Sequence, residues 1–495
     1  NGRDESFDGS KGLEDVDLGM RLELWAKRHS YTCGGLPPFI LDKDLWHIEH
    51  WHGPIAEDVL WYRGPTPKCL PPSSIVLENF TPTPIEKVEA GTDVIGHHGT
   101  PTRVLRTFTR WYRGPIISVM PHYTNIPIEM TPEHPILILR EGRAIWVQAK
   151  DIRVGDFILY PRTRGRVREK KVRLEQYIIS PHLFAIEDGW IRRKTGGAFN
   201  KVKNAMEVDE NLMGVVGYYL AEGCSSRDGI IISFSRDEGD LAEECSAMIR
   251  EVFGVEPRIK ETDTALCVVL YSRLIGRFFA SNFGSRSEDK RLPSWVFSLD
   301  NSLLAHLVRT YYLGDGLTVQ NPPYRIDCYY SFNTSSRALA YQMRMLLMKL
   351  GVLAKMFLRL PNPKHVSVVD GHIIAPKRPM YYLHIISHFE DEMMKITGVR
   401  PPKRKRRCRI DRYFMSGSFI GVKVRKVEVK PYEGIVYNLE TRDNTFLVEG
   451  AIVHNCNFGL LQLNQLEGRW RANERIITRE RCVWVRENIC PRCPN

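Results

Sequence analysis

Two stretches of this 495-residue chain carry the same pattern. NLMGVVGYYLAEG (211–223) and SLLAHLVRTYYLGDG (302–316) are apolar runs at helical spacing, and each ends in an acidic residue followed by glycine. Text rich in β-branched residues follows each run. The repeat predicts a duplicated α/β unit over residues 206–400, in which two similar helices end in the carboxylates of Glu222 and Asp315.

The sequence on either side of this unit has the pattern of β-strands instead of helices. From Cys69 to about residue 160, short β-branched segments alternate with Pro, Gly and Thr at the spacing of hairpins. Similar strands return from 420 to 453. We therefore predict an α/β plus all-β fold class, with an all-β unit built from the two flanks of the duplicated unit.

Composition limits the class of protein. A hydrophobic fraction of 43% and a charged fraction of 26% are typical of globular domains, and the length predicts two to four of them. No stretch approaches the roughly 18 apolar residues of a membrane span, and the polar, acidic start is unlike a signal sequence. We expect a cytoplasmic protein under reducing conditions, with no membrane partner. Because the first residue is Asn rather than Met, we also expect a fragment or a processed product.

Reactive residues stand at both ends of the β-rich text. Cys69 begins it, and His454, Asn455 and Cys456 end it. A thiol is the best side-chain nucleophile at neutral pH, and an Asn side chain can attack its own carbonyl to form a succinimide. A neighbouring His can polarise that carbonyl or protonate the leaving group. The pattern predicts bond breakage at both ends of residues 69–455.

Taken together, the segment from Cys69 to Asn455 resembles an intein with an inserted LAGLIDADG homing endonuclease. The resemblance covers 387 of the 495 residues and rests on five separated motifs in the expected order. It implies a β-rich Hint splicing horseshoe with an inserted pseudo-dimeric α/β endonuclease, flanked by short extein segments. It also implies autocatalytic excision of residues 69–455 and ligation of Lys68 to Cys456.

The resemblance assigns further splicing residues. Thr131-Pro132-Glu133-His134 matches the Thr-x-x-His motif of the family. In this motif His134 would protonate the departing amide nitrogen and Thr131 would hydrogen-bond the site. Two positions depart from the family pattern: Asn438 stands where an Asp coordinates the thioester steps, and Asn444 where a His assists Asn cyclisation. These departures put the splicing rate in question.

The resemblance also assigns an endonuclease site. Glu222 and Asp315 would bind Mg²⁺, a hard cation that seeks oxygen ligands and suits phosphodiester hydrolysis. Lys290, in DKRLPSWVF, matches a family motif in which a lysine activates water or stabilises charge. Lys377 is the candidate for a second such lysine. Substituting either carboxylate would then abolish DNA cleavage.

In this family the two acidic helices pack side by side on small residues. The first helix offers Gly214, Gly217 and Ala221, which suit a close approach. The second helix has the bulkier Arg309 and Tyr312 in what we take to be comparable places.

The net charge of +12 is unevenly distributed. Residues 1–68 carry −4, residues 456–495 carry +3, and the segment between them carries +13. Basic residues concentrate at 161–203 and at 403–409, where they could contact DNA phosphates or form solvated linkers. The predicted partner is the double-stranded DNA homing site in the intein-less host gene, bound by a pseudo-symmetric monomer.

These observations divide the chain into seven predicted parts. They are host fragments at 1–68 and 456–495, splicing segments at 69–165 and 418–455, basic linkers or DNA-contact regions at 166–205 and 401–417, and an endonuclease at 206–400.

The host flanks faintly resemble an HNH nuclease. His47, Glu49, His50 and His52 precede Arg63-Gly64, and splicing would bring Cys456-Asn457 after them. The Cys pairs that bind zinc in that family are incomplete, because Cys33 is single and Cys490 and Cys493 lie at the chain end. Zn²⁺ in the host fragment and another metal-binding or nucleic-acid-binding host are therefore both left open.

Two alternatives to an active splicing endonuclease follow from the same residues. One is a splicing-only intein whose endonuclease has decayed, which the retained Glu222, Asp315 and Lys290 disfavour. The other is a metal-dependent nuclease or DNA-binding protein without splicing, in which Cys69 and Asn455 would have no role. Alanine at these last two positions separates the second alternative from both splicing readings.

Overall fold

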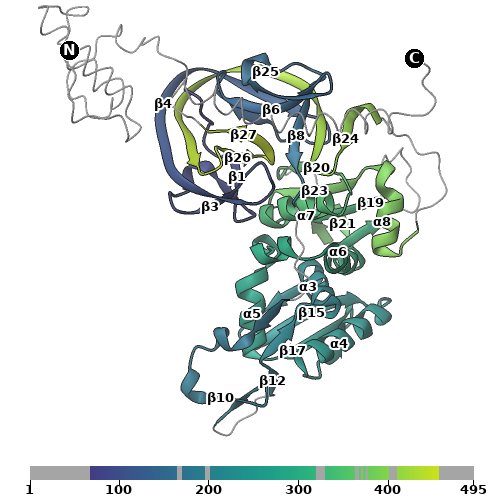
Figure 1. Ribbon diagram of the computed structural model, residues 1–495. Coiled ribbons are helices and arrows are strands. Elements are labelled where there is room, and N and C mark those ends of the chain that lie inside the picture. Colours follow the sequence, from purple (N-terminus) through teal and green to yellow (C-terminus); the bar gives the residue numbers. More distant parts are fainter. Residues whose placement is uncertain are drawn as a thin grey trace, which may run out of the picture.

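The computed structural model describes residues 67–163, 170–194, 201–318, 329–362, 367–369, 372–374, 377–400 and 410–455. The two ends of this span form a β-rich unit, and its middle forms an α/β unit (Figure 1). The predicted strand-rich, mixed α/β class is thus confirmed. Among the described residues, no helix combines the length and the apolar character needed to cross a membrane.

Two long antiparallel strands, β4 (Pro101–Pro121) and β25 (Phe419–Thr441), form the frame of the β-rich unit. They come from opposite ends of the described chain, and both curve around the unit in Figure 1. Ten further strands complete one twelve-stranded sheet among the described residues: β1 (Ile75–Glu78), β2 (Thr81–Pro84), β3 (Asp93–Ile95), β5 (Ile128–Met130), β6 (Pro135–Arg140), β7 (Arg143–Gln148), β8 (Phe157–Pro161), β24 (Tyr413–Met415), β26 (Thr445–Val448) and β27 (Ala451–His454).

The last strand, β27, lies in the interior of this sheet. It pairs with β6 on one side and with β26 on the other, and β26 pairs with β1. All four residues of β27 are buried, as expected of an apolar strand covered on both faces. The chain therefore delivers His454 and Asn455 to the inside of the β-rich unit, near the strand that follows Cys69.

The α/β unit contains the same order of elements twice. The first copy is α3 (Glu210–Glu222), β14 (Gly223–Ser225), β15 (Gly229–Ser235), α4 (Gly239–Phe253), β16 (Arg258–Glu261), β17 (Ala265–Tyr271) and α5 (Arg273–Phe283). The second is α6 (Asn301–Asp315), β18 (Gly316–Thr318), β19 (Tyr330–Thr334), α7 (Arg337–Lys349), β20 (Ala354–Arg359), β23 (Met380–Ile385) and α8 (Glu390–Thr397), with a hairpin of β21 (Ser367–Val369) and β22 (His372–Ile374) inserted.

The sheets of the two copies share one topology. Their orders are β14-β15-β17-β16 and β18-β19-β23-β20, so corresponding strands occupy corresponding places. Both predicted helices form: α3 ends at Glu222 and α6 at Asp315, and a strand begins at the glycine after each. Asp209 and Asp300 cap the two helices by accepting a hydrogen bond from a first-turn backbone N–H. The predicted duplication is confirmed.

Strands occupy described parts of the segment predicted as a basic linker or DNA-contact region (166–205) and of the predicted basic linker 401–417. Within 166–205, β9 (Lys171–Arg173) pairs with β13 (Ala205–Glu207), and β10 (Phe184–Glu187), β11 (Trp190–Arg193) and β12 (Val202–Lys203) form a three-stranded sheet. Lys203 Nζ donates to Glu251 O of α4 at 2.6 Å. In the second linker, β24 already belongs to the twelve-stranded sheet five residues before the predicted boundary at 418. Hydrogen bonding of these backbones in sheets is what excludes a linker there.

Several predicted features lie outside the described residues. These are residues 1–66 of the upstream host fragment with its histidines and Cys33, the downstream host fragment with Cys490, Cys493 and the second nucleophile Cys456, and the basic run 403–409.

Candidate active sites

The Thr131 hydroxyl lies against the bond between Lys68 and Cys69. Its Oγ1 accepts a hydrogen bond from Cys69 N at 2.8 Å and donates to Pro67 O or, at 3.1 Å, to Cys69 O. The backbone N of Thr131 donates to Cys69 O at 2.9 Å. Cys69 itself is buried. The turn before β6 thus holds the peptide groups on both sides of the predicted scissile bond.

His134, three residues further along this turn, is completely buried. Neither ring nitrogen has a hydrogen-bond partner among the described residues. Burial lowers the pKa of His134 to about 3, an effect that the Lys68 backbone opposes and the charge that His454 could carry reinforces. The ring is therefore neutral at physiological pH, with a nitrogen available for the bond beside Lys68.

Asn438, one of the two departures from the family pattern, also reaches the upstream bond. It lies in β25, is fully buried, and its Nδ2 donates a hydrogen bond to Lys68 O. Its own Oδ1 accepts from Leu439 N at 2.7 Å, which fixes the orientation of the amide. Backbone hydrogen bonds between Leu70 and Tyr437, both 2.8 Å, hold β25 beside the start of the segment. The carbonyl that Cys69 would attack thus has a fixed donor.

We expect Asn438→Ala to slow the upstream step by about two orders of magnitude, because a preorganised donor on a developing oxyanion typically contributes that much. The step is measured as cleavage after Lys68 by an added thiol, in a chain that carries Asn455→Ala. Asn301→Ala, at an exposed position of α6, is the matched control. An unchanged rate in Asn438→Ala would show that the contact with Lys68 O has no role.

Asn455 is held by the turn between β25 and β26. Its Nδ2 donates to Thr441 O at 3.2 Å and to Asn444 Oδ1 at 3.3 Å, and its Oδ1 accepts from Thr441 Oγ1 at 3.1 Å. Its backbone N donates to Asn444 O at 2.9 Å. Asn444 has φ of +58°, a conformation that Asn tolerates better than most residues. Thr441 was not singled out in the sequence, since no local motif marks it.

His454 completes the downstream site. Its Nδ1 lies 3.0 Å from Asn455 O, so the tautomer protonated there donates to the carbonyl that Asn455 would attack. The edge of its ring meets Trp146 at 5.3 Å between centroids. Burial lowers the pKa of His454, and the charge of Lys68 contributes in the same direction. The charge of Lys68 influences both His134 and His454, and the antiparallel pairing of Val453 with Ile136 brings the segment before Asn455 beside the turn of His134. The two predicted junctions therefore share one buried site.

A second group of residues lies where α3 and α6 end. Burial and then the charge of Glu222 raise the pKa of Asp315 to about 7. Glu222 is more exposed, and its pKa is also raised, by partial desolvation and Glu238, while Lys290 lowers it. Two carboxylates that disfavour each other's ionisation are suited to a cation between them. The oxygen donor set of Glu222 and Asp315 fits a hard divalent ion.

Lys290 is buried beside the first carboxylate. Its Nζ donates to Tyr219 O at 2.7 Å and to Gly223 O at 2.6 Å, and lies 3.4 Å from the centroid of the Tyr219 ring. Burial lowers the pKa of Lys290 to about 7. Lys377, the candidate for the second copy, is exposed on the chain before β23.

The contact between α3 and α6 is made by small residues of both helices, unlike the prediction from the sequence. A Cβ on Gly217 would lie 1.9 Å from Thr310 Oγ1, and one on Gly314 would lie 2.7 Å from Ala221 Cβ. Gly214 instead faces Met248 of α4. Small residues four apart on α6, Thr310 and Gly314, thus meet Gly217 and Ala221, and no bulky residue intervenes. The prediction that Arg309 and Tyr312 occupy the comparable places was wrong.

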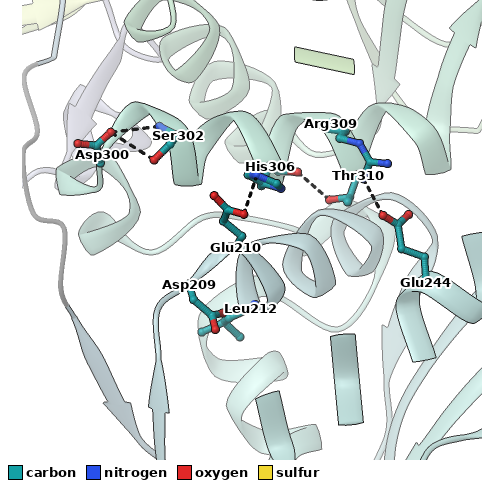
Figure 2. A network of polar contacts seen from close by, with 9 residues as sticks. All are labelled: Asp209, Glu210, Leu212, Glu244, Asp300, Ser302, His306, Arg309 and Thr310. Carbon is teal, nitrogen blue, oxygen red and sulfur yellow. Dashed lines mark hydrogen bonds and ion pairs between the residues drawn. The ribbon is translucent and has the colours of Figure 1, made fainter. Parts of the chain in front are cut away.

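Two polar side-chain contacts flank this close contact (Figure 2). His306 Nε2 lies 3.2 Å from Glu210 Oε2, and Arg309 Nη1 lies 2.9 Å from Glu244 Oε1 of α4. Arg309 therefore points away from the helix interface, towards α4. The pairs and the small residues together fix the relative position of Glu222 and Asp315.

Comparison with known families places the chain. The model of the intein splicing domain matches residues 86–455, about three quarters of the sequence. The chain belongs to the intein splicing domain family. The resemblance predicted from the residues is thereby confirmed. In this intein the matched region ends at Asn455, the residue that the turn of Thr441 and Asn444 holds.

Curated proteins with several different names are similar to this intein. An uncharacterised protein of Methanocaldococcus jannaschii is 24% identical over 81% of this chain and 52% of its own length. The ATP-dependent DNA helicase Hel308 of Thermococcus kodakarensis is 24% identical over 78% and 36%. An iron-sulfur cluster assembly SufBD family protein of Mycobacterium bovis is 24% identical over 80% and 44%. The chain spans about half or less of the length of these relatives.

Two solved structures each cover part of the intein. A variant of the homing endonuclease I-DmoI in complex with its target DNA covers 39% of this chain and 99% of its own, at 14% identity and a TM-score of 0.29. A bacterial intein-like domain from Clostridium thermocellum covers 19% and 68%, at 22% identity and a TM-score of 0.17.

The raised pKa of Asp315 predicts a pH-dependent stability of the intein without metal. The folded protein keeps a proton on Asp315 up to about pH 7, whereas an unfolded chain loses it near 3.8. The free energy of unfolding therefore falls as pH rises between these values. We expect Asp315→Asn to raise the melting temperature by several degrees at pH 8, and by little at pH 4. An equal gain at both pH values would contradict this ionisation behaviour.

Proposed function

We propose that the chain splices itself: residues 69–455 are excised and Lys68 is joined to Cys456. The observation that carries the proposal is the shared buried site, in which Thr131 and Asn438 contact the upstream bond and the Thr441 turn holds Asn455. Membership of the intein splicing family supports protein splicing in general. The four steps and their residues are proposals that follow from this geometry.

In the first step the Cys69 thiol attacks Lys68 C. The Asn438 amide stabilises the oxygen of that carbonyl. The neutral His134 ring takes the proton of the thiol at one nitrogen and delivers a proton from the other to the departing nitrogen of Cys69, so the bond between Lys68 C and Cys69 N breaks as the thioester forms. The Cys456 thiol then accepts the acyl group from Cys69. Asn455 Nδ2 attacks its own carbonyl, with His454 donating to the carbonyl oxygen, and the fragment that begins with Cys456 is released to rearrange to a peptide bond.

Incubation of the purified chain under reducing conditions tests the upstream part of this sequence. We expect hydroxylamine or a thiol to cleave after Lys68 in wild type and not in Cys69→Ala. Equal cleavage of both proteins would remove Cys69 as the first nucleophile.

We further propose that residues 206–400 form an endonuclease that cuts double-stranded DNA. Glu222 and Asp315 would hold Mg²⁺, which when bound stabilises charge on the phosphodiester oxygens. The pKa of Lys290 is lowered to about 7, so this lysine can both hold and release a proton near neutral pH. It would therefore move a proton at Nζ or stabilise charge. The raised pKa values of both carboxyl groups, and the influence of Glu222 on Asp315, support this assignment, because a divalent ion would offset the repulsion between the two charges.

The outer faces of the two four-stranded sheets are the proposed DNA-binding surface. On the second sheet, a hollow of about 400 Å³ is lined by Asn333, Arg359, Tyr382 and His384. Burial and the charges of Lys355 and Arg359 lower the pKa of His384. Polar, aromatic and basic side chains in one hollow suit both phosphate and base contacts. We expect the target to be the intein-less host gene, and the enzyme a monomer in a reducing, cytoplasmic setting.

A further inference from the structure

We propose that Thr441 activates the Asn455 side chain for cyclisation, in the place where the family pattern leads one to expect a histidine at Asn444. The inference rests on the proposed splicing function and assigns a catalytic residue to its downstream step. It starts from one observation: a single residue contacts both ends of the reacting amide.

One of these contacts accepts a hydrogen bond from the Asn455 side chain, and the other donates a hydrogen bond to it. Thr441 O accepts from Nδ2 at 3.2 Å, and Thr441 Oγ1 donates to Oδ1 at 3.1 Å. An amide nitrogen is a weak nucleophile because its lone pair is delocalised into the carbonyl. An acceptor on Nδ2–H and a donor on Oδ1 together favour the imidate form, in which the nitrogen is more nucleophilic. Asn444 Oδ1 supplies a second acceptor at 3.3 Å.

The surroundings strengthen both contacts. Thr441 and Asn455 are each 1% exposed, so bulk water does not compete for these hydrogen bonds. Thr441 Oγ1 also lies 3.0 Å from Thr445 O. The single hydroxyl hydrogen of Thr441 can therefore turn from Thr445 O towards Asn455 Oδ1 as negative charge develops on Oδ1.

The turn that carries Thr441 is anchored by His97, a residue in the loop between β3 and β4. His97 Nδ1 lies 2.7 Å from Thr445 Oγ1, and His97 N donates to the same oxygen at 3.3 Å. Thr445 is opposite His454 in the pairing of β26 and β27. His97 is thus a positioning residue: it fixes Thr445, whose carbonyl in turn orients the Thr441 hydroxyl.

The step is balanced without another reactant. A bond forms between Asn455 Nδ2 and the Asn455 main-chain carbonyl carbon, and the bond from that carbon to the nitrogen of Cys456 breaks. Nδ2 loses one proton and the departing nitrogen gains one. Thr441 is unchanged at the end, since its proton only shifts between acceptors.

The test isolates the downstream step in a full-length chain carrying Cys69→Ala, which blocks the upstream step. Release of the fragment that begins with Cys456 is followed by intact mass. We expect Thr441→Val to slow release roughly tenfold, the effect of one lost hydrogen bond, and Thr441→Ser to restore most of the rate. His97→Ala should slow release as well, with partial rescue by His97→Asn, which can place an amide near Thr445 Oγ1.

A merely structural role predicts a different pattern. Thiol-induced cleavage after Lys68, measured with Cys69 intact, should be slowed far less than release in Thr441→Val if the proposal holds. Release at the parent rate in Thr441→Val, or equal slowing of both junctions, would overturn it. Absence of release even with Thr441 intact would instead contradict the proposed splicing function.

Discussion

Asn455→Ala will leave the insert attached to the downstream flank. Alanine has no side-chain amide, so neither the succinimide nor release of the fragment that begins with Cys456 can follow. The upstream contacts of Thr131 and Asn438 are independent of this side chain, and we expect the thioester at Cys69 to form and accumulate. Added thiol should then split the chain after Lys68 into two products, which intact-mass analysis distinguishes from ligated host.

The matched control is Asn301→Ala, an exposed Asn in α6 of the other unit. It should splice at the wild-type rate, because it lies outside the shared buried site. Ligated product from the Asn455→Ala chain would contradict the assignment of Asn455, whatever the rate.

Glu222→Gln and Asp315→Asn will each abolish DNA cleavage and leave splicing intact. Either change removes one of the two charges that would hold the divalent ion, and a neutral amide binds such an ion far less well than a carboxylate. We expect a loss of at least about a thousandfold, in line with removal of a group that stabilises charge in the transition state. The measurement is cleavage of the uninterrupted host gene in Mg²⁺, alongside the yield of excised insert.

Glu243→Gln is the control, since this carboxylate is exposed on α4. It should cleave DNA as wild type does. Full cleavage by Glu222→Gln or Asp315→Asn would remove that carboxylate from the active site. Loss of splicing in the same variants would show that the substitution disturbs folding instead.

The endonuclease-like helices were predictable because their signals are local. Helical spacing, a capping Asp and a terminal glycine lie within one short stretch, so the ends at Glu222 and Asp315 follow from the residues alone. The contact between the two helices could not be predicted from the residues alone. The rotation of one helix against the other decides which residue of α6 contacts Gly217. The sequence does not give this rotation, so Arg309 was predicted at the contact, whereas Thr310 is the residue that lies against Gly217.

The splicing residues divide in the same way. Cys69 and Asn455 could be proposed from their chemistry and their places at the two ends. The Asn438 contact with Lys68 O spans 370 positions in the sequence, and that of His97 with Thr445 spans 348. Such contacts arise only once β25, β26 and the loop after β3 come together in one sheet. No periodicity or spacing in the sequence encodes them.

The net charge also acquires a meaning from the two junctions. The excised segment carries +13 and the joined flanks carry −1, which together give the net charge of +12. The basic character therefore belongs to the insert with its proposed DNA-binding surface.

Time-resolved mass spectrometry of the wild-type chain tests the central claim most directly. After incubation under reducing conditions we predict a 108-residue product, a free 387-residue insert, and a proteolytic peptide in which Lys68 is followed by Cys456. Persistence of the full-length chain alone after prolonged incubation would contradict splicing.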